Sequence, residues 1–349
     1  MFKPKYTLTN SIVKDLTVIA ECKSIIDRAK ILPSAEIKLR NQALIRMSQS
    51  STAIEGNRLN IKQVEALVAG KTIDASNRDI YEVQNYLTAL KYIDKIVKKN
   101  QKITVKTLLK VHQYLTQNTL PKDKSGLFRQ GPVYVVRHFM GLNQKVIYTA
   151  PSAKLVPSLV KNLITWLSLK ETSEINPIII ASIVHQEIAA IHPFADGNGR
   201  VARAMATLIL YQKGYDFRKL FALEDYYNLN RENYYQAINT GDTYNKDKDL
   251  TTWLSYFTIG FKEEIVSVKN KIQQLSFKKI NNKDPQIFLD DDQQKIIDFI
   301  DKIGQIMTKD VIDILNIPKR TAQLKLHKLK KLNIIKQVGK GRSSAYIIK

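Results

Sequence analysis

The stretch HPFADGNGR, residues 192–200, followed by Arg203, decides how the chain folds. An apolar helical pattern over residues 178–191 runs into it, and a second pattern over residues 201–209 begins directly after it. Because apolar residues recur at helical spacing on both sides, we expect two buried helices that clamp the loop between them. The loop then has the rigid frame that a reactive site needs.

The composition of this loop suits phosphate groups. Gly197 and Gly199 have no Cβ atom and let the backbone approach a ligand closely, while the first N–H groups of the following helix have no intrahelical partners. Arg200 and Arg203 stand three apart on one helical face and can reach outer phosphates. We therefore expect the phosphates of a nucleotide to be bound by Gly197, Asn198, Gly199, Arg200 and Arg203.

Two residues of the loop can supply the chemistry. Asp196 offers hard oxygen ligands to a Mg²⁺ ion carried by a nucleotide. His192 can act as a general base, because an imidazole with an ordinary pKa near ~6.5 accepts a proton from a hydroxyl at neutral pH. Each residue alone also has a structural explanation, such as a core histidine or a turn; the combination is the specific signal.

The loop resembles the signature of the Fic family: histidine, any residue, phenylalanine, any residue, an acidic residue, glycine, asparagine, glycine, arginine, two residues, arginine. Every fixed position of that signature is present in residues 192–203. The resemblance covers residues 36–262 and implies a helical core that transfers AMP from ATP to a protein hydroxyl and releases pyrophosphate. ATP is then the substrate and Mg²⁺ its companion ion.

A helical pattern from Glu36 ends in a segment that matches an inhibitory element of Fic proteins. That element carries Ser or Thr, three residues, Glu, and then Gly or Asn, and here the matching residues are Ser51, Glu55 and Gly56. The resemblance implies that Glu55 pairs with Arg203 and obstructs the γ-phosphate of ATP. An ordinary helix end capped by Gly56 is the structural alternative. Removal of AMP, with Glu55 positioning water, would use the same residues and stays open.

A β-hairpin is predicted inside the otherwise helical core. Residues 133–136 and 146–148 are β-branched and aromatic, and a polar turn at residues 138–144 separates them. Fic proteins carry a flap hairpin here that holds the modified segment of the target by strand addition. The resemblance assigns this contact to Val133, Val135 and Tyr148, with a purely structural ribbon as the alternative.

The segment at residues 230–238 resembles the part of Fic proteins that holds adenine. Tyr235 and Ile238 match the tyrosine and the aliphatic residue that pack the base. Three residues, Asn239, Thr240 and Asp242, compete for the position of a base-binding asparagine. Packing is the structural alternative for paired tyrosines on a helix.

Composition limits the class of protein. The net charge of +23 favours polyanionic partners or reflects a lysine-rich solvated surface. The single cysteine, Cys22, excludes disulfides within the chain and a cysteine-based metal site. We expect a cytoplasmic protein, because MFKPKYTLTN at the N-terminus has no apolar signal core and no run approaches the roughly 18 apolar residues of a membrane helix.

The C-terminal residues predict a second module. Residues 292–303, 308–315 and 318–332 read as helices, and residues 334–338 and 345–348 read as a hairpin around a turn at 339–342. This order resembles a winged helix-turn-helix. Residues 318–349 contain ten Lys or Arg and no Asp or Glu, as a nucleic-acid face requires. The predicted DNA-binding residues are Thr321, Gln323, Lys325, Lys328, Lys340 and Arg342.

We therefore expect a mainly α protein with four parts. These are an N-terminal helical region at residues 1–105 with its inhibitory helix near 45–56, a Fic-type core with a β-hairpin flap at 106–262, a linker at 263–285, and a winged helix-turn-helix at 286–349. The expected partners are ATP, a protein with a modifiable hydroxyl, and duplex DNA or a docked protein at the C-terminal module; a homodimer is left open. The other class of function kept open is a DNA-binding regulator that uses the Fic core as a sensor.

Overall fold

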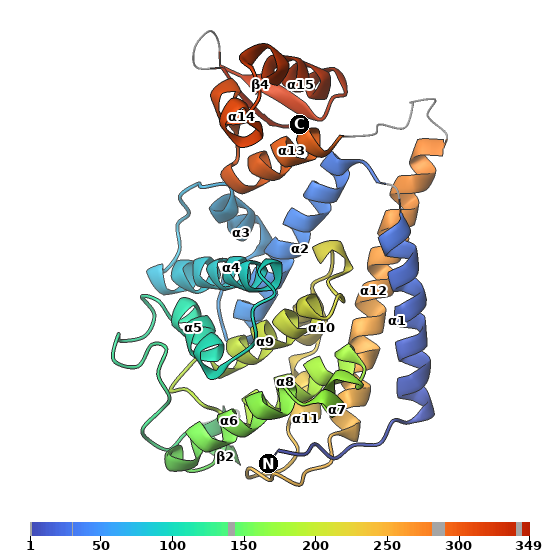
Figure 1. Ribbon diagram of the computed structural model, residues 1–349. Helices are drawn as coiled ribbons and strands as arrows, with labels where there is room; N and C mark the ends of the chain where they lie inside the picture. Colours follow the sequence, from blue (N-terminus) through green and yellow to red (C-terminus); the bar gives the residue numbers. More distant parts are fainter. Residues whose placement is uncertain (1, 30, 139–143, 281–289, 340–343) are drawn as a thin grey trace. The chain divides into compact units, whose positions relative to one another are not determined.

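The computed structural model describes residues 2–29, 31–138, 144–280, 290–339 and 344–349. They form two compact units (Figure 1). The first unit comprises Met1–Arg28 and Gln42–Asn270, and the second comprises Ala29–Asn41 and Lys271–Lys349. The division therefore does not follow a single cut in the sequence.

The first unit is built from helices with one hairpin. Its elements are α1 (Asn10–Arg28), the later part of α2 (Pro33–Ile54), α3 (Ile61–Val68), α4 (Asn77–Lys98), α5 (Val105–Leu115), β1 (Tyr134–His138), β2 (Gln144–Thr149), η1 (Ala153–Leu155), α6 (Val156–Leu167), α7 (Lys170–Ser173), α8 (Pro177–Ile191), α9 (Asn198–Gln212), η2 (Phe217–Lys219), α10 (Leu223–Leu229), α11 (Arg231–Ile238) and the first part of α12 (Thr251–Ile280). The predicted mainly helical fold is confirmed.

The α8–α9 pair forms the centre of this unit. Nearly every residue of both helices is buried, including polar ones such as Ser182 and Thr207. Helices that are buried all round belong in a core, and α4, α5 and α6 pack around the pair (Figure 1). The loop between α8 and α9 is thereby fixed at both ends, as the apolar patterns predicted.

The β1–β2 hairpin pairs antiparallel as expected. Val135 lies opposite Tyr148 and Tyr134 opposite Thr149, with a register irregularity between Val135 and Val136. Such a bulge bends a strand and re-aims its side chains. The predicted turn at residues 138–144 lies largely outside the described residues, which resume at Gln144.

The second unit contains the predicted C-terminal elements and one more strand. Its elements are α13 (Asp291–Ile303), β3 (Ile306–Met307), α14 (Thr308–Leu315), α15 (Lys319–Lys331), β4 (Ile335–Val338) and β5 (Ala345–Ile348). The strands form an antiparallel sheet in the order β3-β5-β4, and β3 is too short for a sequence pattern to reveal it. Ile297, Val311, Leu326 and Ile335 contribute to its core.

Ile37, at the start of α2, belongs to the same core as these C-terminal residues. It is 7% exposed and packs in the cluster that includes Ile297 and Leu326. This packing of Ile37 explains why Ala29–Asn41 belongs to the second unit. The predicted division into a separate N-terminal region differs from this arrangement, because α2 contributes residues to both units.

The linker predicted at residues 263–285 is expected to be helical or partly flexible, and its described part is helical. Helix α12 continues through residue 280, with Ile265, Val268 and Ile272 buried, so most of that range is helical. Residues 281–289 lie outside the described part of the chain.

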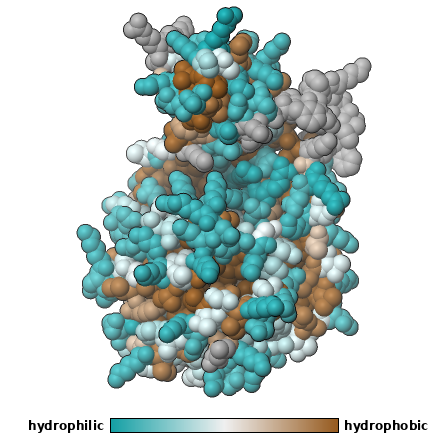
Figure 2. Space-filling model, in the orientation of Figure 1, coloured by the Kyte–Doolittle hydropathy of each residue, from teal (hydrophilic) through white to brown (hydrophobic). Residues whose placement is uncertain are grey.

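The visible surface is mainly hydrophilic. In Figure 2, apolar residues show singly or in small groups among hydrophilic ones, which is ordinary for a folded surface. Within the described ranges, no helix has the length and apolarity to cross a membrane.

Replacing Ile37 by Ala tests its place in the second core. We expect the second unit to lose about 2–5 kcal/mol of stability, because a buried Ile→Ala change removes apolar contacts and leaves a cavity. Hydrogen exchange should therefore speed up in α15 and β5 and stay unchanged in α8 and α9. Ile314→Ala, at a position that is 37% exposed on α14, is the control. Equal effects of both variants would contradict this assignment.

Candidate active site

Two left-handed residues shape the loop between α8 and α9. His192 ends α8 with φ 50°, and Gly197 precedes α9 with φ 80°. Asn198 closes the loop: its Oδ1 accepts from the N–H of Phe194 at 2.8 Å and its Nδ2 donates to the carbonyl of Phe194 at 2.9 Å. The asparagine side chain therefore holds the backbone of the loop in place, and the backbone N–H of Asn198 is available for the predicted phosphate contact.

Among the described residues, one ring nitrogen of His192 has a hydrogen-bond partner and the other has none. Its Nδ1 lies 2.9 Å from the carbonyl of Ala189, which can only accept, so Nδ1 carries the hydrogen and Nε2 holds the lone pair. Burial lowers the pKa of His192, against the opposing effect of the Ala189 hydrogen bond and the Glu55 charge. The imidazole is thus neutral at neutral pH and can accept a proton.

His192 lines a cavity of about 820 Å³. The loop residues Asp196, Gly197, Asn198 and Gly199 also line it, as does Arg203. A cavity of this size is in the range of small-molecule and cofactor sites. The predicted base and most of the predicted phosphate-binding residues therefore share one pocket.

Arg203 is buried and held from several sides. Its Nε donates to Ser51 Oγ at 2.9 Å, its Nη2 donates to the Ser51 carbonyl at 2.8 Å and to Glu55 Oε1 at 2.7 Å, and its Nη1 contacts Tyr234 Oη at 3.4 Å. Burial disfavours the charge, but Glu55 and Tyr234 outweigh it, so the pKa of Arg203 is raised. The guanidinium stays charged and binds the end of α2.

Glu55 lies over the N-terminus of α9. A Cβ atom on Gly199 would stand 2.3 Å from Glu55 Oε1, so the carboxylate sits against the glycine backbone. Gly56 follows with φ 97°, and the N–H groups of Gly56 and Asn57 return to the carbonyls of Ala53 and Thr52. This is a glycine-capped helix end, and it aims Glu55 into the cavity. The glycine-capped helix end and the predicted inhibitory element are therefore compatible interpretations of the same turn.

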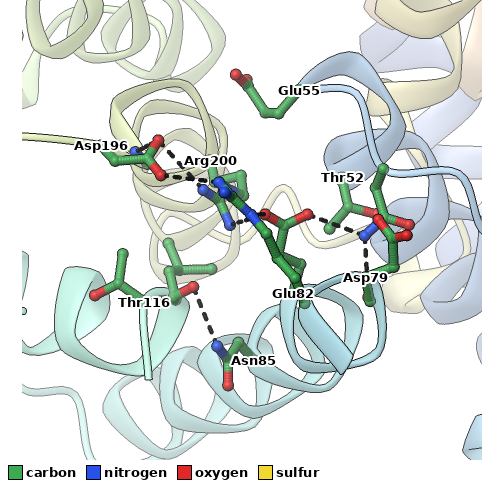
Figure 3. A network of polar contacts seen from close by, with 12 residues as sticks. Thr52, Glu55, Asp79, Glu82, Asn85, Thr116, Asp196 and Arg200 are labelled. Carbon is green, nitrogen blue, oxygen red and sulfur yellow. Dashed lines mark hydrogen bonds and ion pairs between the residues drawn. The ribbon is translucent and has the colours of Figure 1, made fainter. Parts of the chain in front are cut away.

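Asp196 and Arg200 lie next to each other (Figure 3), and Asp196 lines the cavity. Asp196 Oδ1 accepts from the N–H of Gly197 at 2.6 Å and lies 3.6 Å from Arg200 Nη2. Arg200 is 2% exposed and does not line the cavity. Its predicted contact with outer phosphates therefore has less support than that of Arg203, because its charge faces Asp196 and Glu82.

Asp196 suits a Mg²⁺ ion that is bound mainly by phosphates. Its side chain is 44% exposed and lines the cavity, so carboxylate oxygen is available there. Among the described residues, no three His, Cys, Asp or Glu side chains gather as a metal site. One carboxylate plus a nucleotide is a usual magnesium arrangement, so the donor set fits.

Comparison with known proteins agrees with this geometry. Residues 102–210 match the model of the Fic/DOC family. This stretch is a Fic domain. A protein adenylyltransferase Fic of Aedes aegypti is 29% identical over 212 residues, which cover 59% of this chain and 39% of that protein. A protein adenylyltransferase fic-1 of Caenorhabditis elegans is 31% identical over 169 residues, which cover 47% of this chain and 31% of that protein.

A solved structure resembles the chain over its whole length. The crystal structure of a Fic family protein from Desulfovibrio desulfuricans G20 has a TM-score of 0.64 and 25% identity, covering 100% of this chain and 98% of that one. The chain therefore shares both its Fic domain and its wider fold with a solved Fic family protein. The matched part of the chain covers well under half the length of each of the two curated relatives.

Two residues that support the Fic loop were missed in the sequence. Arg129, 5% exposed, donates from Nε to the His192 carbonyl at 2.7 Å and from Nη2 to the Pro151 carbonyl at 2.5 Å. His112 stacks on Phe194 with ring centroids 3.7 Å apart. No motif marks either residue, because each acts through a partner that is distant in the sequence.

His112 is held as a neutral ring. Its Nδ1 accepts from the N–H of Gly126 at 2.9 Å, so Nε2 carries the hydrogen and donates to the Asp196 carbonyl at 3.0 Å. Burial lowers the pKa of His112 to about 4. The ring therefore holds the backbone of the Fic loop at Asp196 and packs against Phe194.

The predicted hairpin residues differ in exposure. Val133 and Val135 are half-buried and line the cavity. Tyr148 is buried, and its hydroxyl donates to the Ala190 carbonyl at 2.7 Å. The tyrosine thus ties the hairpin to α8 and has less surface free for a target than the two valines.

The predicted adenine residues also line the cavity. Ile238 is half-buried, and Tyr235 is 44% exposed. The hydroxyl of Tyr235 donates to the Ile54 carbonyl at 3.1 Å, directly before Glu55. Thr240 Oγ1 instead accepts from Gln186 Nε2 at 3.2 Å, which leaves the alignment of a base-binding asparagine undecided.

The predicted DNA-binding residues are only partly available. Gln323 and Lys328 are exposed on α15, and Thr321 is half-buried. Lys325 is paired with Asp292 at 3.0 Å and Asp290 at 3.4 Å, a pairing that the segregation of charge in the sequence did not reveal. The two predicted wing residues, Lys340 and Arg342, lie outside the described residues.

The low pKa of His112 predicts a pH-dependent stability. In the unfolded chain the imidazole of His112 has its ordinary pKa of ~6.5, whereas in the folded chain its pKa is about 4. The neutral ring therefore stabilises the fold fully above pH 6.5, and this stabilisation is lost as the pH falls to 4. The full difference is about 3 kcal/mol. Urea unfolding at several pH values should show this loss.

The variant His112→Gln separates the effect of His112 protonation from that of the other titrating groups. Its stability deficit relative to wild type should be largest at pH 7 and shrink on acidification, since the glutamine does not titrate. A deficit that is constant between pH 7 and pH 4 would contradict the assignment.

Proposed function

We propose that the protein transfers AMP from ATP to a Ser, Thr or Tyr hydroxyl of a protein target. The observation that carries this proposal is the free Nε2 of neutral His192 in the same cavity as Gly199 and Arg203 at the N-terminus of α9. A base beside an anion-binding helix end suits attack of a hydroxyl on a phosphate. The curated relatives named protein adenylyltransferase support the choice of reaction.

The chemistry is a nucleotidyl transfer. His192 Nε2 takes the proton of the target hydroxyl while its oxygen bonds to the α-phosphorus. The bond between this phosphorus and the oxygen bridging to the β-phosphate breaks, and pyrophosphate leaves. The backbone N–H groups at Asn198 and Gly199, which open α9, would offset the charge that develops on the α-phosphate. A Mg²⁺ ion held by Asp196 would neutralise phosphate charge when bound.

The remaining lining of the cavity supports a separate side for each of the two substrates. The side chains of Tyr235 and Ile238 provide an apolar wall for adenine, supported by their position in the cavity. The β1–β2 hairpin lines the cavity through Val133 and Val135, where an extended target segment can add as a strand. The target hydroxyl would then reach His192 from the hairpin side.

Glu55 is proposed to inhibit this reaction. Its carboxylate occupies the helix end that would receive phosphate, and its pair with Arg203 removes a cation that the triphosphate needs. A negative charge at this point also repels phosphate. Release of Glu55 would give both Gly199 and Arg203 to ATP.

Replacing Glu55 by Gly should increase transfer of radiolabel from [α-³²P]ATP to target protein in host lysate, or to the enzyme itself. We expect about a 10- to 100-fold increase, since a charge-assisted hydrogen bond of about 1.5–3 kcal/mol no longer competes with ATP. His192→Ala in the same background should lower labelling by about 10²–10⁴-fold.

Glu65→Gly, at an exposed position on α3, is the matched control and should label as wild type does. Equal labelling by Glu55→Gly and wild type would refute inhibition by Glu55. Labelling that survives His192→Ala would refute the proposed base. Loss of label from a pre-labelled target with wild type, but not with Glu55→Gly, would instead favour AMP removal.

The C-terminal unit is a candidate for duplex DNA. We propose that it acts as a winged helix-turn-helix, supported by three helices and a small antiparallel sheet with the basic α15 exposed. Lys328 and Gln323 stand on its exposed side, where a phosphate and a base edge could be met. Docking of a protein is the competing use of the same face.

Replacing Lys328 by Ala should weaken DNA binding by the full-length protein. Fluorescence anisotropy with a labelled 20-base-pair duplex should show a salt dependence whose log–log slope falls by about 1 in the variant. Lys309→Ala, an exposed lysine on α14, is the control and should keep the wild-type slope. Absence of binding by wild type at low salt would refute DNA as the partner and favour protein docking.

A further inference from the structure

Glu82 is a buried carboxylate outside the Fic signature. It lies on α4, is 5% exposed, and does not line the cavity. Its Oε1 is 3.6 Å from Arg200 Nη1 and 3.2 Å from Arg78 Nε, and its Oε2 accepts from Asn57 Nδ2 at 3.0 Å. A buried charge in such a place requires charged or hydrogen-bonding partners, and Glu82 has three.

Both arginines that meet Glu82 also reach Asp196. Arg200 Nη2 is 3.6 Å from Asp196 Oδ1, and Arg78 Nη2 is 3.5 Å from Asp196 Oδ2. Figure 3 shows Arg200 between the two carboxylates, with Glu82 on the side of α4 and Asp196 on the side of the loop. Glu82 and Asp196 therefore share the charge of the same guanidinium.

Because Arg200 is almost fully buried, its positive charge needs both carboxylates as partners. Its Nε and Nη1 have no hydrogen-bond partner within the described residues, although Nη1 faces Glu82. A buried guanidinium with one remaining carboxylate would draw that carboxylate into a closer ion pair. For Asp196, closer pairing would mean fewer oxygen lone pairs available on the cavity side.

We propose that Glu82 is a positioning residue that neutralises Arg200 and so leaves Asp196 available for the Mg²⁺ ion of bound ATP. This inference rests on the proposed function, in which ATP binds with Mg²⁺ at Asp196. Glu82 touches neither ion nor nucleotide and acts through Arg200. Outer partners that orient a metal-binding carboxylate commonly matter for metal affinity.

Asn57 fixes the orientation of Glu82 independently of its charge. Its Nδ2 also donates to the Asp79 carbonyl at 3.0 Å, and its Oδ1 accepts from the N–H of Leu59 at 3.0 Å. A glutamine at position 82 can still accept from Asn57 through its amide oxygen. The exchange Glu82→Gln thus removes the charge and keeps the hydrogen bond.

The test compares binding of a fluorescent non-hydrolysable ATP analogue in Mg²⁺ and in EDTA, with Glu55→Gly as the parent. The readout is the ratio of the two binding constants, which reports the contribution of the ion and needs no turnover. We expect Glu82→Gln to lower this ratio about tenfold, with binding in EDTA nearly unchanged. Asp79→Asn removes a carboxylate one turn away on α4 and should keep the parent ratio.

A double variant distinguishes the proposed effect from misfolding of Glu82→Gln. The double variant Glu82→Gln/Arg200→Gln leaves no uncompensated buried guanidinium, since Arg78 is exposed, so its ratio should return to within about threefold of the parent. A parent-like ratio in Glu82→Gln, or a double variant as low as that single one, would overturn the proposal. Failure of the parent itself to bind the analogue would instead refute ATP binding, and with it the proposed function.

Discussion

The burial of one positive charge organises the site. Arg203 emerges from α9, a helix that lies in the core, so its guanidinium has to find partners inside the protein. Ser51 and Glu55 supply them from the end of α2, and Tyr234 supplies another from α11. Three segments that are distant in the sequence therefore converge at the N-terminal half of α9.

The end of α2 is secured by further polar contacts within the first unit. Arg46 Nε pairs with Asp225 at 2.5 Å, and its Nη2 pairs with Glu264 at 2.9 Å. Ser50 Oγ donates to the other oxygen of Asp225 at 2.6 Å. These contacts tie α2 to α10 and α12 at positions 46 and 50, shortly before Glu55.

Sequence patterns predicted the parts of the structure that depend on neighbouring residues. The helices beside residues 192–200 follow from their apolar spacing, and the turn at Gly197 follows from its lack of a Cβ atom. Contacts such as His112 with Phe194, or Glu82 with Arg200, arise only when separate helices pack, so no local pattern contains them. The same reason explains Arg200, which looked like a phosphate ligand by spacing and lies buried beside two carboxylates.

Helix α2 has a consequence for how this protein can evolve. Its first turns place Ile37 in the core with Leu326, and Glu55 directly follows its last residue, Ile54. A recombination event near residue 286 would transfer the C-terminal helices and strands without the isoleucine that completes their core. Residues 286–349 by themselves therefore lack one contributor to that core.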